Sequence, residues 1–214
     1  MTQVDPPVVP EWLGGLVSRI AQVHGGDLAR FTPPPGTATR AGAVLVLFGE
    51  GSQGPDVLLI ERAADMRSHA GQPAFPGGAV DPGDDGPVAA ALREAEEETG
   101  LDPAGVQVIS ALPDLWLPPS GFAVTPVLAF WQRPVPVRAV DPREVARAER
   151  VPVSDLVDPA NRVTVVHPSG YRGPGFQVAD MLVWGFTAML LDRLLELSGW
   201  ALPWVREHEV PVPL

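Results

Sequence analysis

The stretch from Gly77 to Leu101 reads GGAVDPGDDGPVAAALREAEEETGL. It contains a segment with both helix boundaries marked. Pro87 suits the first position of a helix, and Gly100 suits the left-handed residue that ends one. We therefore expect a helix over residues 87–99.

Three glutamates share one side of this expected helix. At about 100° per residue, Glu94, Glu97 and Glu98 lie within roughly 100° of one another, and Glu96 points away. Their mutual repulsion, at a few tenths of a kcal/mol per pair, opposes helix stability, as does their place near the negative end of the helix dipole. A bound cation would offset this cost, and hard carboxylate oxygens suit Mg²⁺ or Mn²⁺. We therefore predict a metal site formed by Glu94, Glu97 and Glu98, which the backbone of Gly78 can approach because glycine has no Cβ.

The structural alternative is an acidic helix face that is simply solvated. Ala89, Ala90, Leu92 and Ala95 give this helix an apolar side, so it is expected to pack against the rest of the protein. A packed acidic helix close to a Gly-Gly pair favours a site over a solvated surface.

The composition limits the possible partners. The chain has 214 residues, of which 45% are hydrophobic and 19% charged, with a formal net charge of −11 and no cysteine. With this net negative charge, the sequence shows no evident positively charged surface for nucleic acid or an anionic membrane. A polyanionic substrate would therefore need a divalent cation to screen its charge. The lack of cysteine excludes disulfides and a cysteine nucleophile, and the N-terminus lacks the apolar segment of a signal peptide. We therefore expect a cytoplasmic protein.

The remaining pattern predicts one α/β or α+β domain, expected over residues 37–200. Residues 1–36 are expected to form a helix over 11–23 and then a proline-rich segment, and the prolines near the end predict an irregular tail over 201–214. The other elements expected within the domain are strands over 43–48, 57–60, 106–112 and 123–131, and a helix over 183–197.

The acidic stretch resembles the Nudix box. Residues 93–101 (REAEEETGL) match the second half of that motif at every fixed position. In the first half, the spacing from Gly78 to Arg93 is one residue longer than in the general pattern, and Asp84 or Asp85 stands in place of the usual glutamate. The resemblance implies an α/β/α sandwich with a mixed sheet. It also implies hydrolysis of a nucleoside diphosphate linked to another moiety, with Mg²⁺ or Mn²⁺ as cofactor.

The sequence just upstream of the box resembles one branch of the Nudix family in particular. Residues 58–62 (LLIER) and 66–78 (MRSHAGQPAFPGG) resemble the extra motif of the coenzyme A pyrophosphatase branch, which also has the longer box. Segments 120–126 and 184–188 are similar to that branch as well. The implied reaction is hydrolysis of coenzyme A or acyl-CoA to 3',5'-ADP and 4'-phosphopantetheine or its acyl form. A homodimer is expected on the family resemblance.

The upstream motif supplies the expected substrate contacts. Arg62, Arg67, His69 and Gln72 are predicted to bind the substrate, and the two arginines are suited to phosphate because they are cationic in an acidic chain. As alternatives, the arginines could pair with nearby acids at the surface, and His69 could be an ordinary loop residue.

Three residues are expected to serve catalysis, namely Arg93, Glu97 and Glu144. Arg93 is expected to orient a glutamate of the metal site rather than to touch the substrate. Glu144 resembles a late acidic residue that some Nudix enzymes use as a base or an additional ligand.

Two other functions fit the same sequence. A pyrophosphatase acting on NADH, ADP-ribose or another dinucleotide would have the same box, and only the upstream motif argues against it. A Nudix-fold binding domain without catalysis is the alternative from another class, although all three box glutamates are present.

Overall fold

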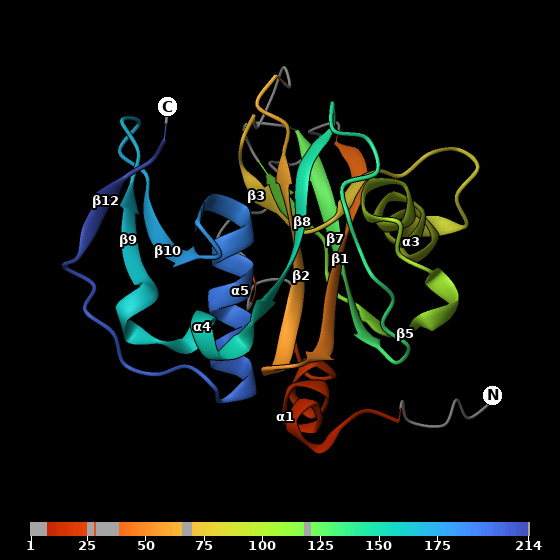
Figure 1. Ribbon diagram of the computed structural model, residues 1–214, viewed down its shortest axis with the longest axis horizontal. Helices are drawn as coiled ribbons and strands as arrows, with labels where there is room; N and C mark the ends of the chain where they lie inside the picture. The colour runs from red at the N-terminus through yellow and green to blue at the C-terminus, as the bar shows by residue number, and fades with distance from the viewer. Residues whose placement is uncertain (1–7, 25–27, 29–38, 66–69, 118–120, 214) are drawn as a thin grey trace.

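The structure is a computed structural model that describes residues 8–24, 28, 39–65, 70–117 and 121–213. Figure 1 shows helix α3 (Gly86–Thr99) and helix α5 (Gly185–Ser198) on opposite sides of a large mixed sheet. Helix α1 (Glu11–Ile20) covers the same face as α5, and a smaller sheet lies on the outer side of α5. The predicted α/β/α sandwich with a mixed sheet is therefore confirmed, with a second sheet added to it.

The large sheet is built around β1 (Arg40–Gly51). This strand pairs in parallel with β7 (Phe122–Trp131) and antiparallel with β2 (Gly54–Arg62), which makes the sheet mixed. The apolar run of β1 is buried on both faces, as expected for a central strand covered by helices. The other strands of this sheet are β3 (Pro73–Ala74), β4 (Gly77–Ala79), β5 (Val106–Ala111), β6 (Leu115–Leu117) and β8 (Val145–Pro152).

The short strands β3 and β4 lie between β1 and β2 at one end of the sheet. β1 and β2 pair directly over residues 48–51 and 54–57. Farther along, β3 pairs with Ile60 and Glu61 of β2, and β4 pairs with residues 42–44 of β1. This arrangement places Gly77 and Gly78 at the end of the sheet, beside the C-terminal half of α3.

Helix α3 begins one residue before its predicted start and ends where predicted. Gly100 follows it in the left-handed conformation, with φ of 70°. Ala91 and Ala95 are fully buried and pack in one cluster with Leu45 and Leu47 of β1. Because alanine is small, the helix backbone lies close to the sheet.

The smaller sheet has the strand order β11 (Met181–Val183), β10 (Arg172–Val178), β9 (Arg162–Val166) and β12 (Glu209–Pro211). Phe176 and Val178 of β10 belong to the core that also contains the buried residues of α5. The sequence patterns did not predict this sheet. The short elements that connect the rest are η1 (Pro103–Gly105), α4 (Val153–Val157) and η2 (Pro159–Asn161).

The C-terminal segment differs from the irregular tail that the prolines predicted. Residues 201–208 lack regular structure, but Glu209–Pro211 form β12, which pairs in parallel with β9. The carbonyl of His208 accepts from Thr164 N–H at 2.8 Å, and Val212 N–H donates to the Val166 carbonyl at 3.1 Å. Pro211 lies between these bonded positions, so its missing N–H would have pointed away from β9. None of the helices in the described ranges has the length and apolar character needed to cross a membrane.

Candidate functional site

The C-terminal turn of α3 meets Gly77 at the end of the large sheet. The Glu98 side chain is only 7% exposed, and its Oε2 accepts a hydrogen bond from Gly77 N–H at 2.9 Å. Gly77 has φ of 155°, and a Cβ added to it would lie 2.2 Å from the carbonyl oxygen of Ala43. Only glycine therefore allows the chain to pass here and to present its N–H to Glu98.

Glu98 lies among other acids in a poorly hydrated position. Burial raises the pKa of its carboxyl to about 7, against the hydrogen bond from Gly77, and the nearby charges of Glu94 and Glu144 raise it further. Arg62 lowers this pKa, and its Nη1 lies 4.0 Å from Glu98 Oε1. A carboxylate in this setting would be stabilised by a further cation.

The backbone of Gly78 passes directly beside Glu94. A Cβ added to Gly78 would lie 2.4 Å from Glu94 Oε1, so a larger residue here would displace the Glu94 carboxylate. The Glu94 side chain is 20% exposed. Burial raises the pKa of its carboxyl, and the hydrogen bond from Arg93 opposes that rise.

Arg93 connects the acids of the site. Its Nε and Nη2 donate to the two carboxylate oxygens of Asp84, each at 3.0 Å, and its Nη1 donates to Glu94 at 3.1 Å and to Glu97 at 3.0 Å. The bidentate bond lowers the pKa of Asp84 and raises the pKa of Arg93. Asp84, whose side chain is 6% exposed, is therefore the upstream acid that contacts the box, whereas Asp85 is exposed.

The three glutamates predicted to bind a metal have different surroundings. Glu97 is 58% exposed, in contrast to Glu94 and Glu98. Within the described part of the chain, no three acidic or histidine side chains converge closely enough to hold a metal ion. Arg93 instead occupies oxygens of Glu94 and Glu97. The donor chemistry still fits a hard divalent cation, because two carboxylates with raised pKa lie beside the close backbone approach at Gly78.

The predicted substrate-binding residues fall at the end of β2. Arg62 N–H donates to the Gln72 carbonyl at 3.1 Å, and Gly71 N–H donates to the Arg62 carbonyl at 3.2 Å, so the two predicted residues lie beside each other. The Nε of Arg62 is buried and has no hydrogen-bond partner among the described residues. Arg67 and His69 lie outside the described residues.

Arg62 does not pair with the adjacent Glu61, as the alternative of a surface ion pair would have it. Glu61 forms its ion pair with Arg147 of β8, at 2.5 Å, whereas Arg62 faces Glu98. Glu144 lies just before β8, and its carbonyl accepts from Ala63 N–H at 2.9 Å. The charge of Glu144 raises the pKa of Glu98, so this late acidic residue lies within electrostatic range of the box glutamate.

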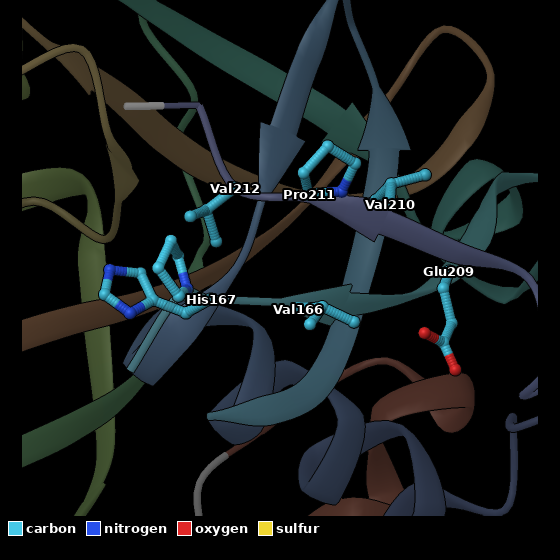
Figure 2. Close-up of a pocket in the computed structure, with 7 residues that line it drawn as sticks. Val166, His167, Glu209, Val210, Pro211 and Val212 are labelled. Carbon is cyan, nitrogen blue, oxygen red and sulfur yellow. The ribbon is translucent and has the colours of Figure 1, made fainter. Parts of the chain in front are cut away.

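A hollow of about 400 Å³ lies elsewhere, on the smaller sheet. Figure 2 shows its lining, which comes from the end of β9 and from β12, and none of the residues predicted for the site belongs to it. The lining residues are Val166, His167, Pro168, Glu209, Val210, Pro211 and Val212.

Comparison with known proteins gives the family. The NUDIX domain model matches residues 38–169 of this chain. The chain belongs to the Nudix family. A relative from Cronobacter sakazakii, described as the uncharacterized Nudix hydrolase NudL, is 41% identical over 147 residues, which cover 65% of this chain and 73% of the relative. A relative from Escherichia coli strain K12 with the same description is 38% identical over 162 residues, covering 72% of this chain and 81% of the relative.

The fold has a counterpart among solved structures. The crystal structure of the Nudix hydrolase RenU from M. smegmatis aligns with a TM-score of 0.54 and 23% identity, covering 78% of this chain and 90% of the other. This likeness concerns the fold, and the family match together with the two relatives identifies the chain as a Nudix hydrolase. Enzymes of this family generally use divalent metal ions and act on small nucleotide derivatives.

One partner of the Nudix box was missed by sequence reasoning. The bond from Gly77 N–H to Glu98 was not predicted, although the paired glycines had indicated close backbone approach at Gly78. The choice between Asp84 and Asp85 was left open, because both precede the helix and their contacts depend on how the loop turns toward Arg93.

Proposed function

We propose that this Nudix hydrolase cleaves the diphosphate of coenzyme A or acyl-CoA. The products are 3',5'-ADP and 4'-phosphopantetheine or its acyl form. The observation that best supports this substrate is the position of Arg62. It belongs to the segment that resembles the coenzyme A branch, and its guanidinium lies 4.0 Å from Glu98 of the Nudix box. Arg62 therefore places a positive charge beside the carboxylates of the Nudix box. In a chain with a strong net negative charge, a polyanionic substrate needs such a local positive charge.

The proposed metal ligands are Glu94, Glu97 and Glu98, together with the backbone of Gly78, and the proposed ion is Mg²⁺ or Mn²⁺. When bound, such an ion neutralises the diphosphate and makes its phosphorus more electrophilic. Arg93 acts as a positioning residue, since its bonds fix the carboxylates of Glu94 and Glu97 relative to Asp84. The Gly77 N–H does the same for Glu98.

Hydrolysis requires one water molecule and one proton acceptor. The water oxygen bonds to phosphorus, the bridging phosphorus–oxygen bond breaks, and the water proton passes to a carboxylate. Glu97 and Glu144 are the proposed acceptors, Glu97 because it is the most exposed of the three box glutamates and Glu144 because its charge acts on Glu98. Arg62 and Gln72, with Arg67 and His69, are proposed to bind the phosphates and the ribose end of the substrate.

A substrate panel tests the proposal. The purified protein is assayed with CoA, NADH, ADP-ribose and ATP, each with Mg²⁺ and with Mn²⁺. We expect the highest kcat/KM with CoA, by about tenfold or more, because one additional charge-assisted phosphate contact contributes that much. A preference for NADH or ADP-ribose would overturn the coenzyme A assignment and leave the Nudix hydrolase standing.

The 3'-phosphate gives a sharper test. CoA differs from dephospho-CoA by one ribose phosphate, and a charge-assisted contact to it should favour CoA by roughly 10- to 100-fold in kcat/KM. Arg62→Ala should reduce this ratio while largely preserving turnover of dephospho-CoA. Arg147→Ala is the matched control, because that arginine pairs with Glu61 on the neighbouring strand. Equal loss with both substrates would place Arg62 at the scissile diphosphate instead.

A further inference from the structure

Helix α5 reaches the substrate-binding segment through one buried hydroxyl. Thr187, 5% exposed, donates from its Oγ1 to the carbonyl of Pro73 at 3.2 Å. The two residues are 114 positions apart in the sequence. Thr187 is the third residue of α5, past the N-cap position at Trp184, and its hydroxyl bonds to a separate strand.

The geometry of β3 explains why this carbonyl is available. Arg62 N–H already bonds to the Gln72 carbonyl, and Ala74 is the partner of Ile60. Polar groups alternate in direction along an antiparallel strand, so the Pro73 carbonyl points away from β2 and toward α5. The proline loses no bond with β2 for the same reason.

The same segment continues directly into the carboxylate site. Phe75, 2% exposed, packs in the core that includes the buried residues of α5, and the Pro76 carbonyl accepts from Leu45 N–H at 2.8 Å. The next residue, Gly77, donates to Glu98. Strand β11, which leads into α5, also lies against β3. Helix α5 therefore supports one side of a segment whose other side contacts the Nudix box.

We propose that Thr187 is a positioning residue of the active site. By holding the Pro73 carbonyl it fixes β3 next to Gln72, whose own carbonyl accepts from Arg62 N–H, although Thr187 lies beyond residues 38–169 of the family match. This inference rests on the proposed function, in which Arg62 and Gln72 contact the substrate.

The test compares Thr187→Val with Thr187→Ser. Valine removes the hydroxyl at nearly constant shape, and we expect KM for CoA to rise by roughly 3- to 10-fold while kcat stays within about twofold, because a loosened binding segment weakens ground-state contacts. Serine keeps a hydroxyl and should restore KM. Ser198→Ala is the matched control, since it removes another buried hydroxyl from α5, at the opposite end, where Ser198 bonds to the Leu195 carbonyl.

The outcomes separate this inference from a general loss of stability. An unchanged KM in Thr187→Val, or an equal rise in Ser198→Ala, would overturn it. If the valine variant does not fold, Thr187→Ala is measured in its place against the same control. If the unmodified enzyme does not hydrolyse CoA, the proposed substrate fails, and the KM comparison is made with the diphosphate that the panel identifies.

Discussion

Glu98 and Arg162 are both buried charged side chains, and their surroundings differ. Glu98, in the Nudix box, has acidic neighbours, a pKa raised to about 7 and an arginine 4.0 Å away. Arg162, in the smaller sheet, is 1% exposed and forms an ion pair with Asp192 of α5. Its guanidinium also lies 4.4 Å from the ring centre of Phe176 and 4.7 Å from that of Trp204.

The two residues differ in their neighbours: Arg162 directly contacts an opposite charge, whereas Glu98 has acidic neighbours and a more distant cation. Arg162 contacts an opposite charge and two aromatic faces, which offset part of the cost of its burial. Burial still lowers its pKa, and its Nε and Nη1 have no hydrogen-bond partner among the described residues. Glu98 has one hydrogen-bond donor and a more distant cation, so its charged form is poorly compensated in the protein alone. Incomplete compensation of this kind is typical of functional sites, where a ligand supplies the missing charge. Three substitutions test this contrast.

The largest effect is expected at Arg162. Arg162→Ala leaves the Asp192 carboxylate without its cation and opens space between the two rings, which should lower the free energy of unfolding by about 3–5 kcal/mol. Denaturant titration measures this loss. Folded enzyme should keep its kcat, because Arg162 lies in the smaller sheet, outside the proposed site. A variant as stable as the original would show that Arg162 is not compensated as the contacts imply.

The next largest effect concerns the Nudix box. Glu97→Gln and Glu98→Gln should each lower kcat on the order of 10²-fold or more, because each removes a charge proposed to hold the metal ion. Glu96→Gln is the matched control, since Glu96 is exposed on the same helix and points away. Circular dichroism should show an unchanged fold in all three variants. Near-normal turnover in both Glu97→Gln and Glu98→Gln would refute the proposed metal site.

The sequence predicted the elements whose boundaries are local. Helix α3 was predictable because Pro87 and Gly100 mark its ends, and the apolar runs of β1 and β7 identify buried strands without further information. The smaller sheet was not predictable, because β9 and β12 pair across more than forty residues and β10 is interrupted by glycine and proline. Long-range pairing of this kind leaves little trace in the periodicity of a single segment.

The sequence predicted which residues form the candidate site, but not how differently their side chains are exposed to solvent. Helical spacing placed Glu94, Glu97 and Glu98 on one side of α3. Their exposure, which ranges from 7% to 58%, depends on how closely β4 approaches the helix. That approach is set by Gly77 and by the strands on either side of it, and none of these contacts is local in sequence.

The smallest effect is expected in the metal-free protein and concerns the pH dependence of stability. The carboxyl of Glu98 has an ordinary pKa of 4.5, raised to about 7 in the folded state by burial. Between these values the folded protein retains a proton that the unfolded chain has lost. Glu98 therefore makes stability fall as pH rises from 4.5 to 7, and this contribution levels off above pH 7.

Glutamine does not titrate, and its amide oxygen can still accept from Gly77 N–H. With a chelator present, Glu98→Gln should therefore gain stability relative to the original protein as pH rises through this window, reaching on the order of 2 kcal/mol at pH 8. Denaturant titrations at pH 5 and pH 8 measure the difference, and Glu96→Gln should show none. A difference between Glu98→Gln and the original that stays constant with pH would mean that the folded protein already compensates the charge of Glu98, and its contrast with Arg162 would disappear.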